Sequence, residues 1–315
     1  MNFTWKRFNV LLSLFLCVSV TAVLLNPSWN LSVYSFGHWK LSFCSCLSCL
    51  RDGDPWFRAL IDASPKPFLS RKHKTSENDF NWWKHLQQEN RNFTFFSATV
   101  DKLFETLPLI SEDVEPRPDR CRTCAVVGNS GHLKGSRYGP LIDSHDVIIR
   151  INRGRTKGYE ADVGTKTTHH VMYPESAIKL HNTTNLVFFA FKIDDLLWLL
   201  KTFSPGDGTV NSTNIANKNL VMILNPAFMK YIHEDWLGSD GAYPSTGFLT
   251  LALSLHICDE VSVFGFRADR DGNWSHYFEV LKNKDLGTGP HSGKHEYSII
   301  EQLHEMEKVT FYKGH

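Results

Sequence analysis

The segment from residue 121 to residue 175 constrains the fold most, because two apolar runs in it are each followed by polar residues. The first run, at 125–127, leads directly into the turn sequence Gly-Asn-Ser-Gly at 128–131. A β-branched run before a glycine-rich turn is typical of a buried strand that feeds a helix N-terminus. The free N–H groups and dipole of such a terminus suit an anion. A strand–turn–helix corner without a ligand is the alternative, and a short glycine motif alone does not separate the two.

The second apolar run, at 147–149, ends in polar residues that include Asn152. Ligands of open α/β sheets bind outside the carboxyl ends of the strands, so Asn129 and Asn152 are expected to face one crevice. Strand candidates at 186–191, 220–224 and 261–266 alternate with helix candidates at 194–202 and 247–256. This alternation predicts an α/β fold in which helices flank a mainly parallel sheet.

The N-terminal region contains an almost uninterrupted apolar segment at 8–25, which follows Lys6 and Arg7. The segment is long enough to span a bilayer. A cleaved signal peptide is the alternative, but residues 26–29 form a poor cleavage site. Because a positive flank stays cytoplasmic, we predict a cytoplasmic tail at 1–7, a transmembrane signal-anchor at 8–25, a stem at 26–43 and a lumenal domain at 44–315.

Sequons and cysteines agree with a lumenal address. Six cysteines beyond the anchor form an even number, which suggests disulfides in an oxidising compartment, with a zinc site as the alternative. They are Cys44, Cys46, Cys49, Cys121, Cys124 and Cys258. The N-x-S/T sequons, candidate glycosylation sites, begin at Asn30, Asn92, Asn182, Asn211 and Asn273.

Charge gives no indication of a nucleic-acid partner, because 34 basic and 33 acidic residues are interleaved. Two Asp-x-Asp triplets, at 52–54 and 269–271, are candidates for holding a divalent cation on a nucleotide diphosphate. The second triplet, followed by Gly272, also fits a simple turn.

A second helix N-terminus is expected where Tyr243, Ser245, Thr246 and Gly247 precede an apolar run at 248–255. Ser245 or Thr246 can cap this helix, and its free N–H groups suit an anion. A capped structural helix without a ligand is the commoner case. Two such termini in one α/β sheet are consistent with a donor substrate that carries both a phosphate and a carboxylate group.

Two of the 15 histidines are candidate acid–base groups. Histidine titrates near neutral pH and is the commonest general acid or base. His291 lies in a loop flanked by glycine and proline, and loops at a sheet rim are where catalytic groups are placed. His276 lies between Ser275 and Tyr277, whereas His169 and His170 are better explained as core or hydrogen-bonded structural residues.

Together these segments resemble the animal sialyltransferases. Residues 124–174 resemble the large motif of that family and 225–266 the small motif. His276 with Tyr277 resembles the third motif, and His291 with Glu296 the very small motif. The similarity is closest to the α-2,3-sialyltransferases that act on Galβ1-3GalNAc, and four segments carry it: 44–49, 82–87, 164–176 and 311–315.

The resemblance implies a single Rossmann-like domain, a GT-A-like variant, in the Golgi lumen. It implies inverting transfer of sialic acid from CMP-sialic acid to the 3-hydroxyl of galactose on glycoproteins or glycolipids, with no cofactor and no metal. The absence of a metal requirement favours the turn at 269–272. The family also implies single-pass type II insertion in the Golgi membrane. Whether the chain forms a homo-oligomer is left open.

Residue roles also come from the resemblance. His291 is the implied general base, and His276 would bind the donor phosphate. Glu296 and Tyr277 would support the site, and Gln87 would touch the acceptor. The implied donor-site residues are Asn129, Ser130, Asn152, Tyr243, Ser245, Thr246 and Gly247. The implied disulfides are Cys124–Cys258, Cys44–Cys49 and Cys46–Cys121.

Two features depart from this family branch. Arg267 stands where the branch usually has glycine, and the loop at 204–219 is short and lacks the tyrosine used at the substrate site. They motivate two alternatives, a relative with another acceptor or linkage and a catalytically silent paralogue that binds nucleotide or sialoside.

Overall fold

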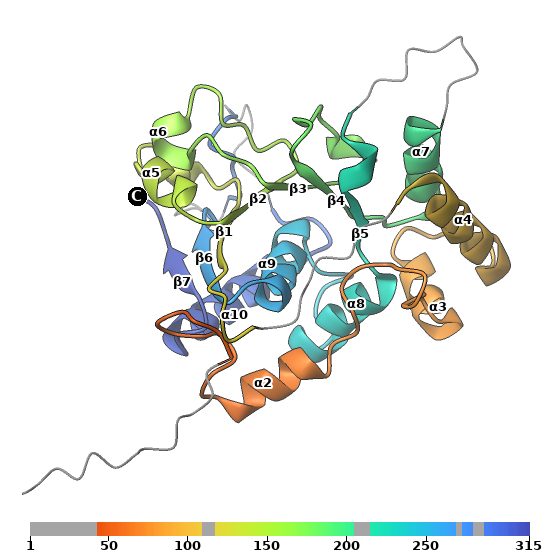
Figure 1. Ribbon diagram of the computed structural model, residues 1–315, viewed down its shortest axis with the longest axis horizontal. Coiled ribbons are helices and arrows are strands. Elements are labelled where there is room, and N and C mark those ends of the chain that lie inside the picture. Colours follow the sequence, from red (N-terminus) through yellow and green to blue (C-terminus); the bar gives the residue numbers. More distant parts are fainter. Residues whose placement is uncertain (1–42, 109–116, 205–214, 269–272, 280–286) are drawn as a thin grey trace, which may run out of the picture. The chain divides into compact units, whose positions relative to one another are not determined.

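The computed structural model describes residues 43–108, 117–204, 215–268, 273–279 and 287–315 (Figure 1). The predicted tail and anchor, most of the stem, and the sequons at Asn30 and Asn211 lie outside these ranges. The second Asp-x-Asp triplet and most of the loop at 204–219 do as well. None of the described helices combines the length and apolarity needed to cross a bilayer.

Seven parallel strands form one sheet in the order β5-β4-β3-β2-β1-β6-β7. From β1 the chain first builds the sheet outward to β5, then returns to the other side of β1 as β6 and β7. The carboxyl ends of β1 and β6 therefore flank the point where the strand order reverses, which is where open α/β sheets bind ligands. The strands are β1 Thr123–Val127, β2 Val147–Ile151, β3 His169–Met172, β4 Asn185–Phe188, β5 Val221–Ile223, β6 Glu260–Phe264 and β7 Thr310–Tyr312.

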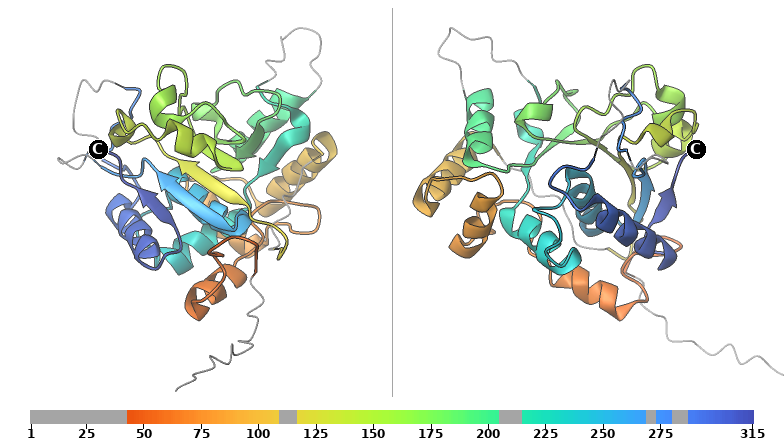
Figure 2. Two further views of the ribbon diagram at one scale, coloured as in Figure 1. Left: turned by 60° about the vertical axis from the view of Figure 1, so that its left-hand side comes forward. Right: turned by 180° about the vertical axis from the view of Figure 1, so that it is seen from behind.

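Helices cover the two faces of the sheet unequally. The longer helices α9 and α10 lie on one face, whereas the other face carries the short helices α5 and α6 and long loops (Figures 1 and 2). Helix α9 packs on β1, β2 and β6 and is apolar all round, as expected of a fully enclosed helix. The α-helices are α2 Pro55–Asp62, α3 Glu77–His85, α4 Phe93–Thr106, α5 Gly139–Asp143, α6 Glu160–Val163, α7 Ile193–Phe203, α8 Pro226–Tyr231, α9 Thr246–Ile257 and α10 Gly293–Glu305.

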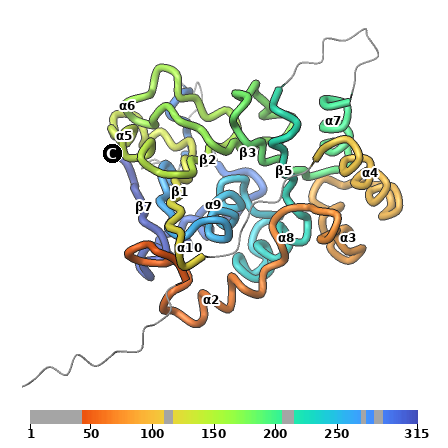
Figure 3. The backbone as a smooth tube through the Cα atoms, viewed as in Figure 1, coloured from red at the N-terminus to blue at the C-terminus, as the bar shows by residue number. Residues whose placement is uncertain are grey.

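The helices before β1 pack against elements that come much later in the chain. Helix α3 contacts α8, and α4 contacts α7, as the backbone trace shows (Figure 3). Trp83 of α3 is fully buried, and its Nε1 donates a hydrogen bond to the carbonyl of Ala190 at 2.8 Å. This packing places Gln87, just after α3, beside the segment that leads into α9.

The sequence prediction was wrong for the segment after β1. A helix was expected to start at the Gly-Asn-Ser-Gly turn, but only a 3₁₀ turn, η1 Gly131–Leu133, follows. The backbone of this turn is hydrogen-bonded to the end of β6 instead. Gly128 N donates to Phe264 O at 2.8 Å, and Ser130 N donates to Gly265 O at 3.1 Å. A Cβ on Gly128 would lie 2.4 Å from Gly265 O, so this close approach requires glycine.

Three disulfides join the six cysteines: Cys44–Cys49, Cys46–Cys121 and Cys124–Cys258. These are the pairs that the family resemblance implies. In the described ranges one cluster, Cys46, Cys121 and Glu260, has ligand atoms close enough for a metal, but its cysteines are bonded to each other. Asp54 of the first Asp-x-Asp triplet caps α2 by accepting bonds from Trp56 N and Phe57 N.

Candidate active site

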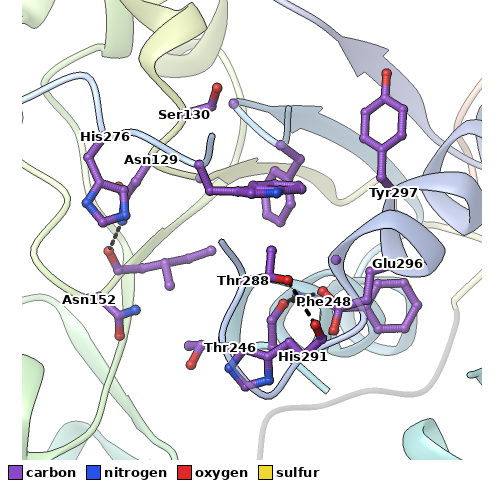
Figure 4. A pocket seen from close by; sticks show the side chains of 18 of the residues that line it. Asn129, Ser130, Asn152, Thr246, Phe248, His276, Thr288, His291, Glu296 and Tyr297 are labelled. Atoms are coloured by element: carbon purple, nitrogen blue, oxygen red, sulfur yellow. Dashed lines mark hydrogen bonds between the residues drawn. The ribbon is translucent and has the colours of Figure 1, made fainter. Parts of the chain in front are cut away.

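A cavity of about 280 Å³ lies at the carboxyl ends of β1, β2 and β6. In Figure 4, Asn129, Asn152 and His276 stand on one side and Phe248, Glu296 and Tyr297 on the other, with Thr246 and His291 between them. Nine of the residues singled out from the sequence line it: Asn129, Ser130, Asn152, Ser245, Thr246, Gly247, His276, His291 and Glu296.

His291 reaches the cavity from the loop just before α10. Its Nδ1 lies 2.9 Å from the carbonyl oxygen of Tyr243, and its ring meets the Tyr243 ring edge-on at 4.8 Å. Thr288 Oγ1 donates to the carbonyl of His291 at 2.9 Å. Because a carbonyl only accepts, Nδ1 carries the hydrogen, and Nε2 of the neutral ring keeps its lone pair. His291 is therefore held in the tautomer that a general base needs.

Glu296 joins the N-termini of α10 and α9. Its two carboxylate oxygens accept bonds from Ser245 N at 2.7 Å and Ser245 Oγ at 2.6 Å. Ser245 Oγ in turn caps α9 by accepting from Phe248 N at 3.1 Å. Burial raises the pKa of Glu296 above its usual range, although the bonds from Ser245 oppose that shift. Two segments that carry site residues thus share one hydrogen-bonded junction.

His276 lies opposite, in a segment bridged to Ser130 as an isolated antiparallel pair. Its Nδ1 lies 2.7 Å from Glu279 Oε2, and its ring stacks on Phe278 at 5.2 Å. The guanidinium of Arg155 lies 5.7 Å from the centre of the Phe278 ring. The carboxylate and the aromatic ring fix the orientation of His276 and leave Nε2 for other partners.

Asn129 and Asn152 follow β1 and β2 and are held by backbone bonds. Asn129 Nδ2 donates to Ile151 O at 3.1 Å, which fixes the amide orientation and leaves its second N–H. Asn152 adopts a left-handed conformation with φ of 55°. Its carbonyl lies 2.6 Å from Nε2 of His170, a buried residue whose pKa is lowered to about 4 by burial. His170 is thus a structural residue that supports Asn152.

Gln87, Tyr243 and Tyr277 do not line this cavity. Gln87 Nε2 donates to Tyr243 Oη at 2.9 Å, and the carbonyl of the same Tyr243 is the partner of His291 Nδ1. Tyr277 is buried, and its hydroxyl donates to the carbonyl of Arg155. Burial raises the pKa of Tyr277 to about 12, so its hydroxyl stays protonated at neutral pH.

Sequence reasoning missed several lining residues, because they lie in loops, in apolar runs or, for Tyr297, within helix α10, without a chemical signature. They are Tyr173, Phe248, Phe266, Trp274, Thr288 and Tyr297. Trp274 and Thr288 are within three residues of the two candidate histidines, and that proximity is the signal that could have found them.

Comparison with known proteins identifies the family of this chain. The family model described as glycosyltransferase family 29 (sialyltransferase) matches residues 68–308. The chain belongs to glycosyltransferase family 29, the sialyltransferases. As a sialyltransferase it is a glycosyltransferase enzyme, and the matched residues include every residue of the cavity lining.

Similar sialyltransferases are known in sequence and in structure. The chain is 40% identical over 289 residues to "CMP-N-acetylneuraminate-beta-galactosamide-alpha-2,3-sialyltransferase 1" of Gallus gallus, covering 86% of this chain and 82% of the relative. It is 41% identical over 283 residues to the alpha-2,3-sialyltransferase 2 of Mus musculus, covering 86% and 80%. A crystal structure of a mammalian sialyltransferase in complex with Gal-beta-1-3GalNAc-ortho-nitrophenol matches with a TM-score of 0.75 and 38% identity, covering 86% of this chain and 100% of that one.

Proposed function

We propose that this sialyltransferase transfers sialic acid from CMP-sialic acid to the 3-hydroxyl of the terminal galactose in Galβ1-3GalNAc, on glycoproteins and glycolipids. The names of the relatives and the disaccharide in the matching crystal structure support donor, linkage and acceptor. The observation that carries the proposal is the bond between His291 Nδ1 and Tyr243 O, which leaves a basic nitrogen in a cavity lined by family motifs.

His291 acts as the general base in this proposal. Its Nε2 takes the proton of the galactose 3-hydroxyl while that oxygen attacks C2 of sialic acid. The bond between C2 and the phosphate oxygen breaks on the opposite side, so the configuration inverts and CMP leaves. A positioned base contributes about 10²- to 10⁴-fold to such a step.

His276 stabilises the leaving phosphate. Glu279 accepts from Nδ1, and the ring of His276 lines the cavity, so its Nε2 is the atom that bonds the phosphate oxygen. The second N–H of Asn129 and the side chain of Asn152 add donors on the same side. Fixed donors around a departing phosphate do the work of a cation, so we propose that no metal or cofactor takes part.

Helix α9 holds the rest of the donor. Its first turn, Thr246 and Gly247, lines the cavity, and free N–H groups at a helix N-terminus suit the carboxylate of sialic acid. Gly247 leaves room for the ring of Phe266, since a Cβ there would lie 2.9 Å from that ring. Gln87 and the Tyr243 hydroxyl form the acceptor side.

The cellular setting is proposed from the sequence and the family. Residues 1–7 form the cytoplasmic tail, 8–25 the signal-anchor and 26–43 the stem of a type II Golgi membrane protein. Residues 44–315 form its lumenal catalytic domain.

The test is a product assay with the detergent-solubilised full chain, CMP-sialic acid and EDTA throughout. Galβ1-3GalNAc and Galβ1-4GlcNAc are offered separately, and linkage-specific sialidases identify the product. An α2,3-linked product on Galβ1-3GalNAc supports the proposal. Product only on Galβ1-4GlcNAc overturns the acceptor. CMP binding without product overturns the activity in favour of the silent paralogue that Arg267 motivates.

A further inference from the structure

A second, larger hollow lies on the sheet face opposite α9. It has a volume of about 770 Å³ and lies between the loop after β2 and the segments that lead into β3 and β4. The connections from β2 to β3 and from β3 to β4 contain only α6, of four residues, and the 3₁₀ turn η2 Pro174–Ser176. Within the described residues these connections therefore place no long helix over this face, as the lime and green segments of Figure 1 show. We call this hollow the basic groove.

Among the described residues, the groove is lined by five cations and by no carboxylate. Its five cationic side chains are all exposed: Arg153, Arg155, Lys157, Lys166 and Lys179. None of them forms an ion pair with a carboxylate in the part of the chain that the structure describes. Five cations without a directly contacting carboxylate make this hollow locally positive, although the chain has a net charge of only +1.

Acidic groups in the neighbouring segments bond mainly to backbone N–H groups rather than to the groove cations. The hydrogen bond from Gly158 N lowers the pKa of Glu160, and the charge of Lys157 helps to lower it. Asp143 accepts bonds from Thr165 N, Thr165 Oγ1 and Lys166 N, all within 3.0 Å. Glu160 accepts from Gly158 N at 3.0 Å. Lys166 Nζ donates to the carbonyl of Asp143 and keeps its charge unpaired. An external anion is the partner that these cations lack.

We propose that the basic groove binds an anionic oligosaccharide through its sulfate or carboxylate groups. Six threonines line the groove and make its wall polar as well as basic: Thr156, Thr165, Thr167, Thr168, Thr183 and Thr184. Five of their hydroxyls already form hydrogen bonds within the protein, so the cations carry the recognition of the anion. Of the lining residues that the structure describes, only His170 and His181 have aromatic rings, so these residues offer no stacking platform of the kind found at a single-strand nucleic-acid site. None of the large exposed apolar side chains of the described residues lies in it, which argues against insertion into a membrane.

The groove and the donor cavity lie on either side of the residues that follow β2. Asn152 lines the cavity and Arg153 the groove. Arg155 lines the groove and covers Phe278, on which His276 stacks. The choice of an oligosaccharide among anions rests on the proposed function, because an enzyme that acts on glycans meets such chains in its compartment.

The experiment measures binding of a fluorescein-labelled heparin hexasaccharide to the detergent-solubilised full chain. Saturating CMP is present, so that the donor cavity is occupied. We expect saturable binding that weakens about tenfold or more in the Lys157→Ala/Lys179→Ala variant. With two fewer cations, the protein releases fewer of the counterions that are condensed on the oligosaccharide, and this release favours binding. Both lysines are exposed. The matched control, Lys72→Ala/Lys102→Ala, removes two exposed lysines outside the groove and is expected to bind as wild type does.

Two further arms make the outcome decisive. An α2,8-linked oligosialic acid carries only carboxylates, so lysine-dependent binding of both probes assigns a general anion site, and binding of heparin alone assigns a sulfate site. The Asn182→Gln chain is measured in parallel, because this predicted sequon lies between the lining residues His181 and Thr183.

Three results would overturn the proposal. They are equal affinity of the double variant and wild type, probe binding that is seen without CMP and is lost when saturating CMP is added, and lysine-dependent binding to anionic phospholipid vesicles with none to either oligosaccharide. The binding measurement needs no turnover, so a failure of the proposed activity would be seen separately in the product assay.

Discussion

The imidazole Nδ1 of His291 lies 2.9 Å from the backbone carbonyl oxygen of Tyr243, a residue 48 positions earlier in the chain. Tyr243 leads into α9, whose cap Ser245 is bonded in turn to Glu296 of α10. The candidate base and the helix proposed to hold the donor therefore share one support. A displacement of the α9 N-terminus would move both together, so binding and proton transfer are geometrically linked.

Replacing His291 by alanine should lower turnover by about two to four orders of magnitude, the usual effect of losing a general base. The affinity for CMP should change little, because the donor contacts proposed for α9 and His276 remain. Initial rates at saturating donor and CMP titration calorimetry measure the two quantities. His73→Ala, a change at an exposed histidine outside the cavity, is the matched control. Wild-type turnover in His291→Ala would refute the base assignment.

Replacing Asn129 by aspartate should raise the KM for CMP-sialic acid by about ten- to a hundredfold. The substitution removes the N–H group that bonds Ile151 O and puts a negative charge beside the proposed position of the CMP phosphate. Hydrogen bonds to charged groups are worth about 1.5–3 kcal/mol. Donor-dependent kinetics check the change. Asn219→Asp, on an exposed side chain away from the cavity, should leave the KM unchanged. If both variants behave alike, Asn129 does not contact the donor.

The sheet was largely predictable from the sequence, because buried parallel strands are apolar runs. Five of the seven strands overlap predicted runs, whereas β3 and β7 were not assigned. Strand β3 contains His169 and His170, and a histidine pair does not look like a core strand. The strand can be buried because its histidine rings have local hydrogen-bond partners, such as Thr168 Oγ1 at 2.9 Å from His169 Nδ1. Strand β7 has only three residues, too few to show a period.

The site was predictable where residue chemistry and loop position coincided, as at Asn129, Asn152 and His291. Its geometry was not, because it depends on contacts between distant segments. The bonds from Ser245 to Glu296 and from Gln87 to Tyr243 join residues 51 and 156 positions apart. The turn after β1 bonds to the end of β6 rather than starting a helix, and local propensity carries no information about that partner.

Replacing Gly128 by alanine should destabilise the fold by about 1–3 kcal/mol, the range for forcing an added methyl into a packed site. The new Cβ would lie 2.4 Å from Gly265 O and 2.9 Å from the Phe266 ring, and neither neighbour is the end of a flexible chain. Thermal denaturation of the solubilised protein measures the loss as a lower Tm. Gly287→Ala is the control, since nothing lies within 4 Å of its added Cβ. Equal Tm values for both variants would mean that the turn relaxes without cost.

Replacing Asp195 by asparagine should remove a pH dependence of stability. Burial raises the pKa of Asp195 to about 6 in the folded chain, against about 3.9 when unfolded. Its Oδ2 accepts bonds from Phe191 N at 2.8 Å and Lys192 N at 3.2 Å, which an asparagine oxygen can keep. Oδ1 accepts no hydrogen bond from the described residues and has only the Lys192 ammonium at 3.8 Å. The folded state binds the proton more tightly, so this contribution is complete below about pH 4 and is lost as the pH rises through about 6.

The loss amounts to at most about 3 kcal/mol, from a shift of about two units. The measurement is the Tm of wild type and variant from pH 4 to pH 7.5. Asp195→Asn should gain stability relative to wild type as the pH rises, with most of the change between pH 4 and pH 6.5. The neighbouring Asp194, whose side chain is 65% exposed, supplies the control Asp194→Asn, which should follow the wild-type profile. Parallel curves for Asp195→Asn and wild type would show that the buried carboxyl titrates as it does in the unfolded chain.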